Sequence, residues 1–288
     1  MPASAAALPP PGAAPTPLRT VLRAPGFGAE TACVSTPEHL LAALEACGVH
    51  NARCELRGSG EVPVLDGSAL PFVAAVARAG LATACCADRG QPMPRLRLAL
   101  RRALAVRDGA AFVTFSPAAA PRLAAGVHFP DEPLLALQWA RWGPTADGDA
   151  AAFARDLAPA RTFATAAGVR AAQAAGLARG GSLACALVAD SGAWLNAATE
   201  AHGPLRLRNE PAAHKLLDLL GDVALAARPG HAGLPLGTVT AFRAGHALHA
   251  RFVAALTAAA AEEGDDAWVT EIAHKQGAAR REKQGGTA

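Results

Sequence analysis

The stretch HKLLDLLGD, residues 214–222, combines the leucines of a buried helix with regularly spaced polar side chains. Residues four apart lie along one face of an α-helix, so His214, Asp218 and Asp222 line up there. One interpretation is an exposed helix whose charges are solvated, because charged residues mostly lie on protein surfaces. The other is a buried helix that carries a functional site, and the rest of the chain has to decide between them.

Composition sets the first limits. The chain has 288 residues, of which 51% are hydrophobic and 18% charged, so it can form one large domain or two ordinary ones with a sizeable core. A net charge of +3 is too small to indicate a nucleic-acid binder, which needs a clustered basic face. The one basic run, Arg280, Arg281 and Lys283, is expected to be part of a solvated polar tail that spans residues 263–288.

Neither a membrane span nor a cysteine framework is expected. The most apolar run, after Phe252, is interrupted by Glu262 and Glu263 before it reaches the roughly 20 residues that a membrane helix requires. The sequence therefore predicts a soluble protein. The cysteines contain no C-x-x-C pair, which favours buried thiols in a reducing compartment over disulfides or zinc ligands; they are Cys33, Cys47, Cys54, Cys85, Cys86 and Cys185.

The first 29 residues are rich in Ala and Pro and contain no acidic residue before Glu30. Two interpretations remain open for them, a disordered leader or an organelle transit segment. The next unit, residues 30–90, is expected to begin with a helix capped by Thr36 and stopped by Gly48. A strand at 52–58 and a strand–turn–helix at 61–79 should follow, and the Gly- and Pro-rich loop 88–94 should end this domain.

The second unit, residues 95–262, mixes both kinds of element. Alternating and apolar runs predict strands at 95–106, 110–117, 124–129, 135–142, 182–190 and 238–244. Helical periodicity predicts helices at 150–158, 168–177, 210–220 and 245–261. Hairpins with a pair of helices on one sheet face predict an α+β fold.

The polar residues in apolar surroundings suggest metal-assisted amide hydrolysis. His39, His214 and Asp218 form a plausible three-ligand zinc site with an open position for water, whose pKa zinc lowers towards ~7. Glu38, beside His39, is the candidate general base. The alternative for Glu38 is a capping box with Ser35, which would serve only the helix.

A second acid must protonate the leaving amine, and His246 is the candidate. Asp222, one turn beyond Asp218, could hold His246 in the right tautomer and raise its pKa. A lone histidine just inside a helix is more often structural than catalytic, so the assignment depends on these side chains meeting in space.

Six segments in order carry a resemblance to a known family: STPEHLLAAL (35–44), EVPVLDGSALPF (61–72), ARTF (160–163), GLARGGS (176–182), HKLLDLLGD (214–222) and GHALH (245–249). Together they resemble the UDP-3-O-acyl-N-acetylglucosamine deacetylases of lipid A biosynthesis, most closely the plant-type branch. The resemblance covers roughly residues 30–258. It implies two similar two-layer α/β sandwich domains with the active site between them.

The resemblance also implies roles for individual residues. Zinc would be bound by His39, His214 and Asp218, with Glu38 as base and His246 as acid. Thr162 would stabilise the oxyanion, Lys215 and Arg243 would contact the carbonyl side and the diphosphate, and Phe129 would stack on the uracil. An apolar passage for the acyl chain would be lined by Phe163, Val169, Ala186 and Val188. The implied partner is a UDP-sugar acyl-lipid substrate, with no nucleic acid and a monomeric state.

Two departures from the family accompany the resemblance. No G-x-G-L-H-type motif precedes Ser35, so the first sheet is expected to lack strands, as in a chain truncated at its N-terminus. Ala213 stands where a basic residue usually precedes the histidine. Two alternatives therefore stay open, a non-catalytic nucleotide-sugar or acyl-lipid binding paralogue and a zinc amidase with another substrate. The compartment would be the mitochondrion in a plant-type eukaryote and the cytoplasm in a bacterium.

Overall fold

A computed structural model describes residues 3–8, 19–23, 33–88, 90–144, 150–198 and 203–270 of the chain. The expected polar tail lies outside the described residues from residue 271 on, including its basic run. Within the described ranges, helices and strands are mixed along the chain, so the predicted α+β class is confirmed.

A five-stranded sheet forms the centre of the molecule, in the order β4-β5-β11-β6-β7. Its strands are β4 (Leu104–Asp108), β5 (Ala111–Pro117), β11 (Gly237–Phe242), β6 (Arg122–Val127) and β7 (Gln138–Trp142). β11 runs antiparallel to β5 and parallel to β6, which makes the sheet mixed. The predicted hairpin of β4 and β5 around residues 107–109 is confirmed.

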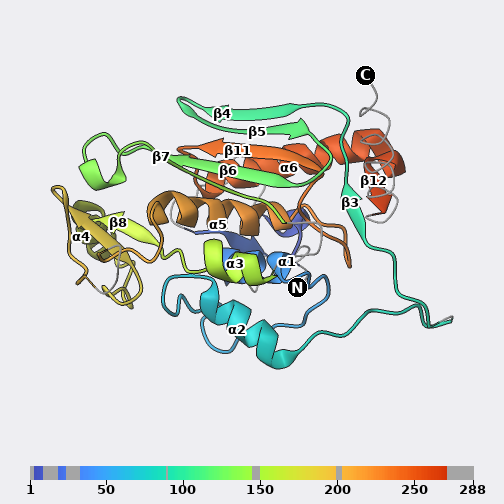
Figure 1. Ribbon diagram of the computed structural model, residues 1–288, viewed down its shortest axis with the longest axis horizontal. Coiled ribbons are helices and arrows are strands. Elements are labelled where there is room, and N and C mark those ends of the chain that lie inside the picture. Colours follow the sequence, from blue (N-terminus) through green and yellow to red (C-terminus); the bar gives the residue numbers. More distant parts are fainter. Residues whose placement is uncertain are drawn as a thin grey trace, which may run out of the picture.

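Two long helices cover one face of this sheet, α5 (Glu210–Ala224) and α6 (His246–Glu263), as Figure 1 shows. Inward strand residues such as Val113, Phe115 and Val239 are almost fully buried under them and belong to the same core cluster as α5 and α6. α5 is buried on nearly every side, including His214, Asp218 and Asp222. The interpretation of this stretch as an exposed helix is therefore wrong.

The first half contains helices but little sheet. α1 (Glu38–Ala46) lies against α5, whereas α2 (Leu70–Ala79) lies at the periphery (Figure 1). The strand predicted at 52–58 is wrong, because these residues are exposed and have no strand partner. Thr36 is not the N-cap of α1; its φ of 58° is left-handed and Pro37 occupies the cap position. The division into two similar domains stays a prediction.

Part of the expected leader belongs to the fold. β1 (Val21–Arg23) pairs antiparallel with β2 (Cys33–Ser35). The 3-10 turn η1 (Ala5–Ala7) places Ala7 in the core, and the backbone N–H of Ala5 donates to the Leu225 carbonyl. The expectation of a disordered leader is therefore wrong for these residues, because Val21, Leu22 and Ala7 are apolar side chains that find a buried surface.

A smaller unit projects from one end of the main sheet. It contains β8 (Phe163–Thr165), β9 (Leu187–Asp190) and β10 (Ala193–Trp194) in a three-stranded sheet beside α4 (Ala166–Ala174). The remaining elements are β3 (Leu96–Leu98), which pairs with β12 (Trp268–Thr270), α3 (Ala150–Asp156), η2 (Pro133–Leu135) and η3 (Gly264–Ala267).

Several predicted strands are shorter than expected. The run 95–106 divides into β3 and β4, residue 135 ends a 3-10 turn before β7, and only the end of 182–190 is extended. All six cysteines are free, but none is buried, so the expectation of buried thiols is wrong. No helix among the described residues is long and apolar enough to cross a membrane.

Candidate metal centre and active site

The candidate metal ligands come together where α1 crosses α5. Ligand atoms of His39, His214 and Asp218 all lie within 4.8 Å of one another, and all three side chains are buried. Gly221 makes this close approach possible, since a Cβ there would lie 2.0 Å from the Glu38 backbone oxygen. Any larger residue at position 221 would push the start of α1 away from α5.

Hydrogen bonds and ring contacts orient the three side chains. Asp218 Oδ1 lies 3.5 Å from His39 Nε2 and 3.4 Å from His214 Nε2, and the two imidazoles meet edge to face. His214 Nδ1 lies 3.1 Å from the Ala160 carbonyl oxygen, which can only accept, so Nδ1 carries the proton and Nε2 keeps its lone pair. His214 therefore presents a ligand atom to the centre.

The electrostatics keep His214 and Asp218 in the protonation states that a cation requires. Burial lowers the pKa of His214 to about 3, so its imidazole is neutral at physiological pH. Burial alone would raise the pKa of Asp218, but His214, Lys215 and His246 outweigh it and hold this pKa well below its usual range. Lys215 Nζ donates to Asp218 Oδ2 at 2.7 Å. His214 and Asp218 are thus ready to bind a metal without first losing protons.

Glu38, at the start of α1, and His246, at the start of α6, both lie beside this centre. His246 Nε2 lies 3.9 Å from Glu38 Oε1 and 3.7 Å from Asp218 Oδ2. Burial raises the pKa of Glu38 to about 7, with His246 acting in the opposite direction. The capping-box alternative for Glu38 is wrong, since its side chain is buried and Oε2 accepts from the backbone N–H of Thr20.

Asp222 holds His246 in place, as the sequence predicted, and its carboxylate also contacts His249 and Thr20. His246 Nδ1 and His249 Nδ1 each lie 2.8 Å from Asp222 Oδ2, and the Thr20 hydroxyl donates to Asp222 Oδ1. Burial would lower the pKa of His246, but the carboxylates of Asp222 and Asp218 raise it to about 9. His246 is therefore protonated at neutral pH and can donate a proton from Nε2.

Thr20 and His249 were missed by the sequence reasoning. Thr20 lies in the segment interpreted as a leader, where nothing indicated a contact with the site. His249 stands three residues after His246, a spacing that places both side chains on one helix face and could have identified it. Asp222, His246 and His249 also cluster closely enough for a metal, but both Nδ1 atoms face the same carboxylate oxygen and serve as donors to it.

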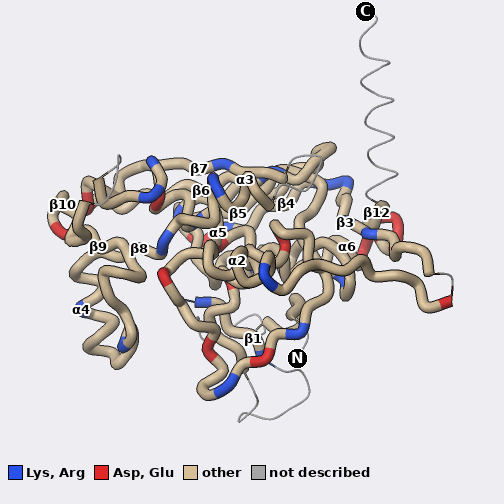
Figure 2. Tube along the Cα trace, turned by 60° about the horizontal axis from the view of Figure 1, so that its bottom comes forward, with Lys and Arg blue, Asp and Glu red and all other residues tan. Residues whose placement is uncertain are grey.

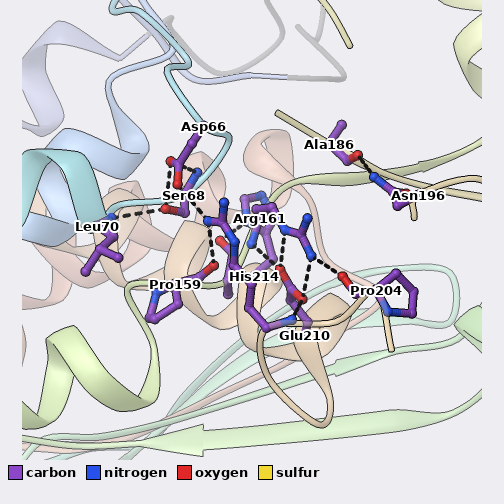
Figure 3. A network of polar contacts seen from close by, with 12 residues as sticks. Asp66, Ser68, Leu70, Pro159, Arg161, Ala186, Asn196, Pro204, Glu210 and His214 are labelled. Carbon is purple, nitrogen blue, oxygen red and sulfur yellow. Dashed lines mark hydrogen bonds and ion pairs between the residues drawn. The ribbon is translucent and has the colours of Figure 1, made fainter. Parts of the chain in front are cut away.

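A buried ion pair fixes the segment that orients His214 (Figure 3). Glu210, fully buried in the first turn of α5, accepts from the backbone N–H and the guanidinium of Arg161 at 2.8–3.2 Å. It also accepts from the backbone N–H of Arg206, while Arg161 donates to the Pro204 carbonyl. Because Ala160 directly precedes Arg161, this network holds the carbonyl that His214 contacts.

Beside the centre lies an open pocket of about 640 Å³. Of the predicted substrate contacts, Phe129, Lys215 and Arg243 line it. The Phe163 ring stands edge-on to Phe129 at 5.9 Å, and Lys215 Nζ lies 5.7 Å from the Phe163 ring centre. Arg243 has a left-handed φ of 51° and donates its backbone N–H to the Gly126 carbonyl, which places it at the rim.

The remaining residues predicted to contact the substrate lie on the segment after Ala160 and in the projecting unit. Thr162 lies on the segment fixed by Arg161, and its backbone N–H donates to the Gly67 carbonyl. Val169 on α4, Ala186 and Val188 lie in the projecting unit and do not line the 640 Å³ pocket. Ala186 instead accepts from Asn196 Nδ2, as Figure 3 also shows.

Comparison with known proteins gives the family. The family model for LpxC, UDP-3-O-acyl N-acetylglycosamine deacetylase, matches residues 6–258. The chain belongs to this family. A relative from Arabidopsis thaliana named "Probable UDP-3-O-acyl-N-acetylglucosamine deacetylase 1, mitochondrial" is 38% identical over 232 residues, covering 78% of this chain and 68% of the relative. A relative from Trichormus variabilis, named UDP-3-O-acyl-N-acetylglucosamine deacetylase, is 40% identical over 223 residues, 77% of this chain and 73% of its own.

The family match covers every residue of the site described above. It extends from before Thr20 to beyond His249, so the residues missed by the sequence reasoning lie inside it. The match also begins at residue 6, within the segment expected to be a leader. The resemblance predicted from six short segments is therefore confirmed.

Proposed function

We propose that this chain is a zinc-dependent deacetylase that hydrolyses the N-acetyl group of UDP-3-O-(3-hydroxyacyl)-N-acetylglucosamine. The products are acetate and the free glucosamine amine, as expected for an early step of lipid A biosynthesis. One observation carries the proposal: a buried His-His-Asp cluster has a candidate base and a candidate acid beside it, 3.9 Å from each other. The names of the relatives supply the substrate.

The residues fit a zinc ion. Two buried atoms of the cluster, His39 Nδ1 and Asp218 Oδ1, have no hydrogen-bond partner, and buried polar atoms left unpaired are costly. Two imidazoles and one carboxylate are a common catalytic ligand set for zinc. When bound, the ion would supply a Lewis acid that polarises the amide carbonyl and lowers the pKa of water.

The proton transfers then fall to Glu38 and His246. Glu38, with a pKa near 7, takes a proton from the attacking water, because its carboxylate faces the cluster and is poised at neutral pH. His246, protonated and held through Nδ1 by Asp222, gives its Nε2 proton to the leaving amine nitrogen. A non-catalytic binding protein would need neither group.

Substrate recognition follows from the pocket. Lys215 and Arg243 supply positive charge for a carbonyl oxygen and a diphosphate, and Phe129 presents an exposed ring to a base. Thr162 would assist the oxyanion. The projecting unit, with Phe163, Val169, Ala186 and Val188, would receive the acyl chain. We also assign residues 30–90 and 95–262 to two domains that share the site.

The test is acetate release from the UDP-sugar substrate by the purified chain, with and without added zinc. Zinc-dependent release supports the proposal. No release from a folded, zinc-loaded chain would favour the binding paralogue, and release from another N-acetyl substrate alone would favour a different amidase. The compartment follows the relatives, mitochondrial for a plant-type source and cytoplasmic for a bacterial one.

Two variants separate the roles within the site. Glu38→Gln should keep zinc and lose turnover by roughly 10²- to 10⁴-fold, as expected for a general base. Asp218→Ala should lose the metal, while Asp156→Ala, an exposed carboxylate paired with Arg155, serves as the control that loses neither. Equal zinc loss in the Glu38 and Asp218 variants would overturn the role given to Glu38.

A further inference from the structure

The outer face of the five-stranded sheet, opposite α5 and α6, has an unusual composition (Figure 1). Strand alternation sends every second residue outward, and these positions include no Asp or Glu within the five strands. The face consists of Ala105, Arg107, Phe112, Thr114, Ser116, Arg122, Ala124, Gly126, Trp139, Arg141, Thr238, Thr240 and Phe242. Elsewhere, acidic and basic positions are interspersed along the described trace (Figure 2).

Its most prominent feature is a row of aromatic rings across the strands. Register places Phe112 on β5 directly beside Phe242 on β11. Trp139 lies on β7, two strands from Phe242, with Gly126 of β6 between them. Trp139 stacks on Phe242 with ring centres 5.5 Å apart and planes 15° from parallel, and Phe112 follows at 5.8 Å. A Cβ on Gly126 would lie 2.8 Å from both rings, so only glycine leaves room for this stack.

Three arginines surround the aromatic row. Arg107 caps it, with its guanidinium 5.6 Å from the Phe112 ring centre. Arg122 and Arg141 are exposed, and no carboxylate among the described residues pairs with either. They line a shallow groove of about 590 Å³ with Trp139, Thr238 and Thr240. An exposed Trp139 and two half-buried phenylalanine rings therefore lie beside arginines with which no described carboxylate pairs.

We propose that this sheet face docks on an anionic lipid bilayer. Trp and Phe side chains at a protein surface favour the boundary between acyl chains and headgroups. Arginines beside them attract anionic headgroups, and the absence of acidic residues within the strands removes the repulsion that such a surface would meet. The threonines of β11 add hydroxyl groups that can donate to phosphate oxygens.

The ring contacts favour a bilayer over single-stranded nucleic acid. A nucleic-acid platform offers free ring faces on which bases stack. On this sheet, one face of Phe242 is covered by Trp139, and Phe112 is covered by Arg107. Three arginines also provide few phosphate contacts for a polymer whose affinity depends on them.

The docking face borders the candidate substrate pocket. Gly126, which lies under the aromatic row, also lines the 640 Å³ pocket with Arg243 and Phe129. If the proposed function holds, docking would bring this pocket close to the surface where an acyl-carrying substrate gathers. The docking proposal itself rests on the sheet face alone and needs no activity for its test.

The experiment is flotation of the full chain with vesicles of phosphatidylcholine alone or mixed with phosphatidylglycerol. Each arginine near an anionic surface should contribute roughly fivefold in binding, so the mixed vesicles should bind on the order of 100-fold more tightly at low salt. The double variant Arg122→Glu/Arg141→Glu should lose most of this preference. Its matched control is Arg57→Glu/Arg78→Glu, which makes the same charge change at exposed arginines outside the sheet and should bind like wild type.

The thermal unfolding midpoint of each variant shows whether it remains folded. Trp139→Ser, which keeps all charges, should weaken binding to mixed vesicles at high salt, where the apolar contribution remains. Equal losses in the two double variants would overturn the proposal, as would mixed vesicles that bind no better than neutral ones. Tighter binding of a single-stranded oligonucleotide, or a dimer in solution that Trp139→Ser dissolves, would assign the face to those partners instead.

Discussion

Helices α5 and α2 both have apolar sequences, but only one of them is buried. Every residue of α5 except Lys215 and Ala224 is buried, between the sheet on one side and α1 on the other. In α2, Phe72 alone is buried, and Leu70 is 38% exposed. An apolar helix is thus stabilised only as far as neighbouring elements cover it. The candidate catalytic and metal-binding side chains lie on α5 and at the start of α1, where neighbouring elements bury the helix on both sides.

α1 connects these two regions. It belongs to the half with little sheet, but its contact with α5 buries Glu38 and His39 as fully as the ligands on α5. The site therefore requires the α1–α5 contact and Thr20, directly before β1, from the first half. Helix α2 touches it indirectly, through the Leu70 amide that donates to Ser68 at the edge of the Asp66–Arg206–Glu210 network. Substitutions in the two regions can therefore test how far stability and activity depend on burial.

The largest effect is expected from a cavity in α5. Leu217→Ala removes a fully buried side chain and should lower the free energy of unfolding by about 2–5 kcal/mol. The same change at Leu70 in α2 should cost less than about 1 kcal/mol, because that side chain is already partly in water. Urea unfolding of both variants measures the difference. Equal costs would show that something else covers α2 in solution.

A smaller effect is expected where α1 meets α5. Gly221→Ala places a methyl group against the Glu38 carbonyl and should cost about 1–3 kcal/mol, with weaker zinc binding because His39 moves away from Asp218. Gly180→Ala, where a Cβ meets nothing within 4 Å, is the control. Unfolding and zinc titration measure the two effects. Unchanged zinc affinity in the Gly221 variant would contradict the dependence of the site on this contact.

The hydroxyl of Thr20, the residue directly before β1, tests the contribution of this segment. Thr20→Val keeps the shape of the side chain but removes the donor to Asp222, at a cost of about 1–2 kcal/mol of stability and roughly tenfold in turnover. Thr20→Ser keeps the hydroxyl and should restore most of both. Steady-state kinetics of the two variants measure the effect. Equal turnover of the Thr20→Ser and Thr20→Val variants would exclude this role of the hydroxyl.

The smallest expected effect concerns the pH dependence of turnover, which leaves the fold intact. The rate should fall as pH drops below about 7, because Glu38 becomes protonated, and a bound cation would move this limb lower. It should also fall above about 9, because His246 loses its proton. Asp222→Asn removes a charge that raises the pKa of both His246 and Glu38, so both limbs should move to lower pH, the alkaline limb further because Asp222 is hydrogen-bonded to His246. A shift of the acidic limb alone would reverse the assignment of acid and base.

The sequence predicted elements best where the residues of the element itself, its period and its turn or first-turn residues, are enough to define it. The period of α5, with Pro211 in its first turn, was sufficient to predict that helix, and the hairpin of β4 and β5 followed from a local turn. Residues 52–58 alternate like a strand, but alternation produces a strand only where a partner accepts its hydrogen bonds. No described strand lies beside them.

The candidate site divides in the same way. His214, Asp218 and Asp222 could be grouped by spacing on one helix, and His39 by its motif. Thr20 could not, because its partner Asp222 lies 202 residues away and its own segment is dominated by Ala and Pro. Contacts of that kind depend on tertiary packing, which local pattern does not encode.

The Arg161–Glu210 pair has a consequence for slow opening motions. Glu210 accepts from the backbone amides of Arg161 and Arg206 as well as from the guanidinium, so both connecting segments are bonded to the first turn of α5. These loop amides should exchange their protons with solvent only when α5 itself opens, as part of one cooperative unit. Deuterium uptake at Arg161 would then report on the integrity of the site, from a residue that is itself neither candidate ligand nor acid nor base.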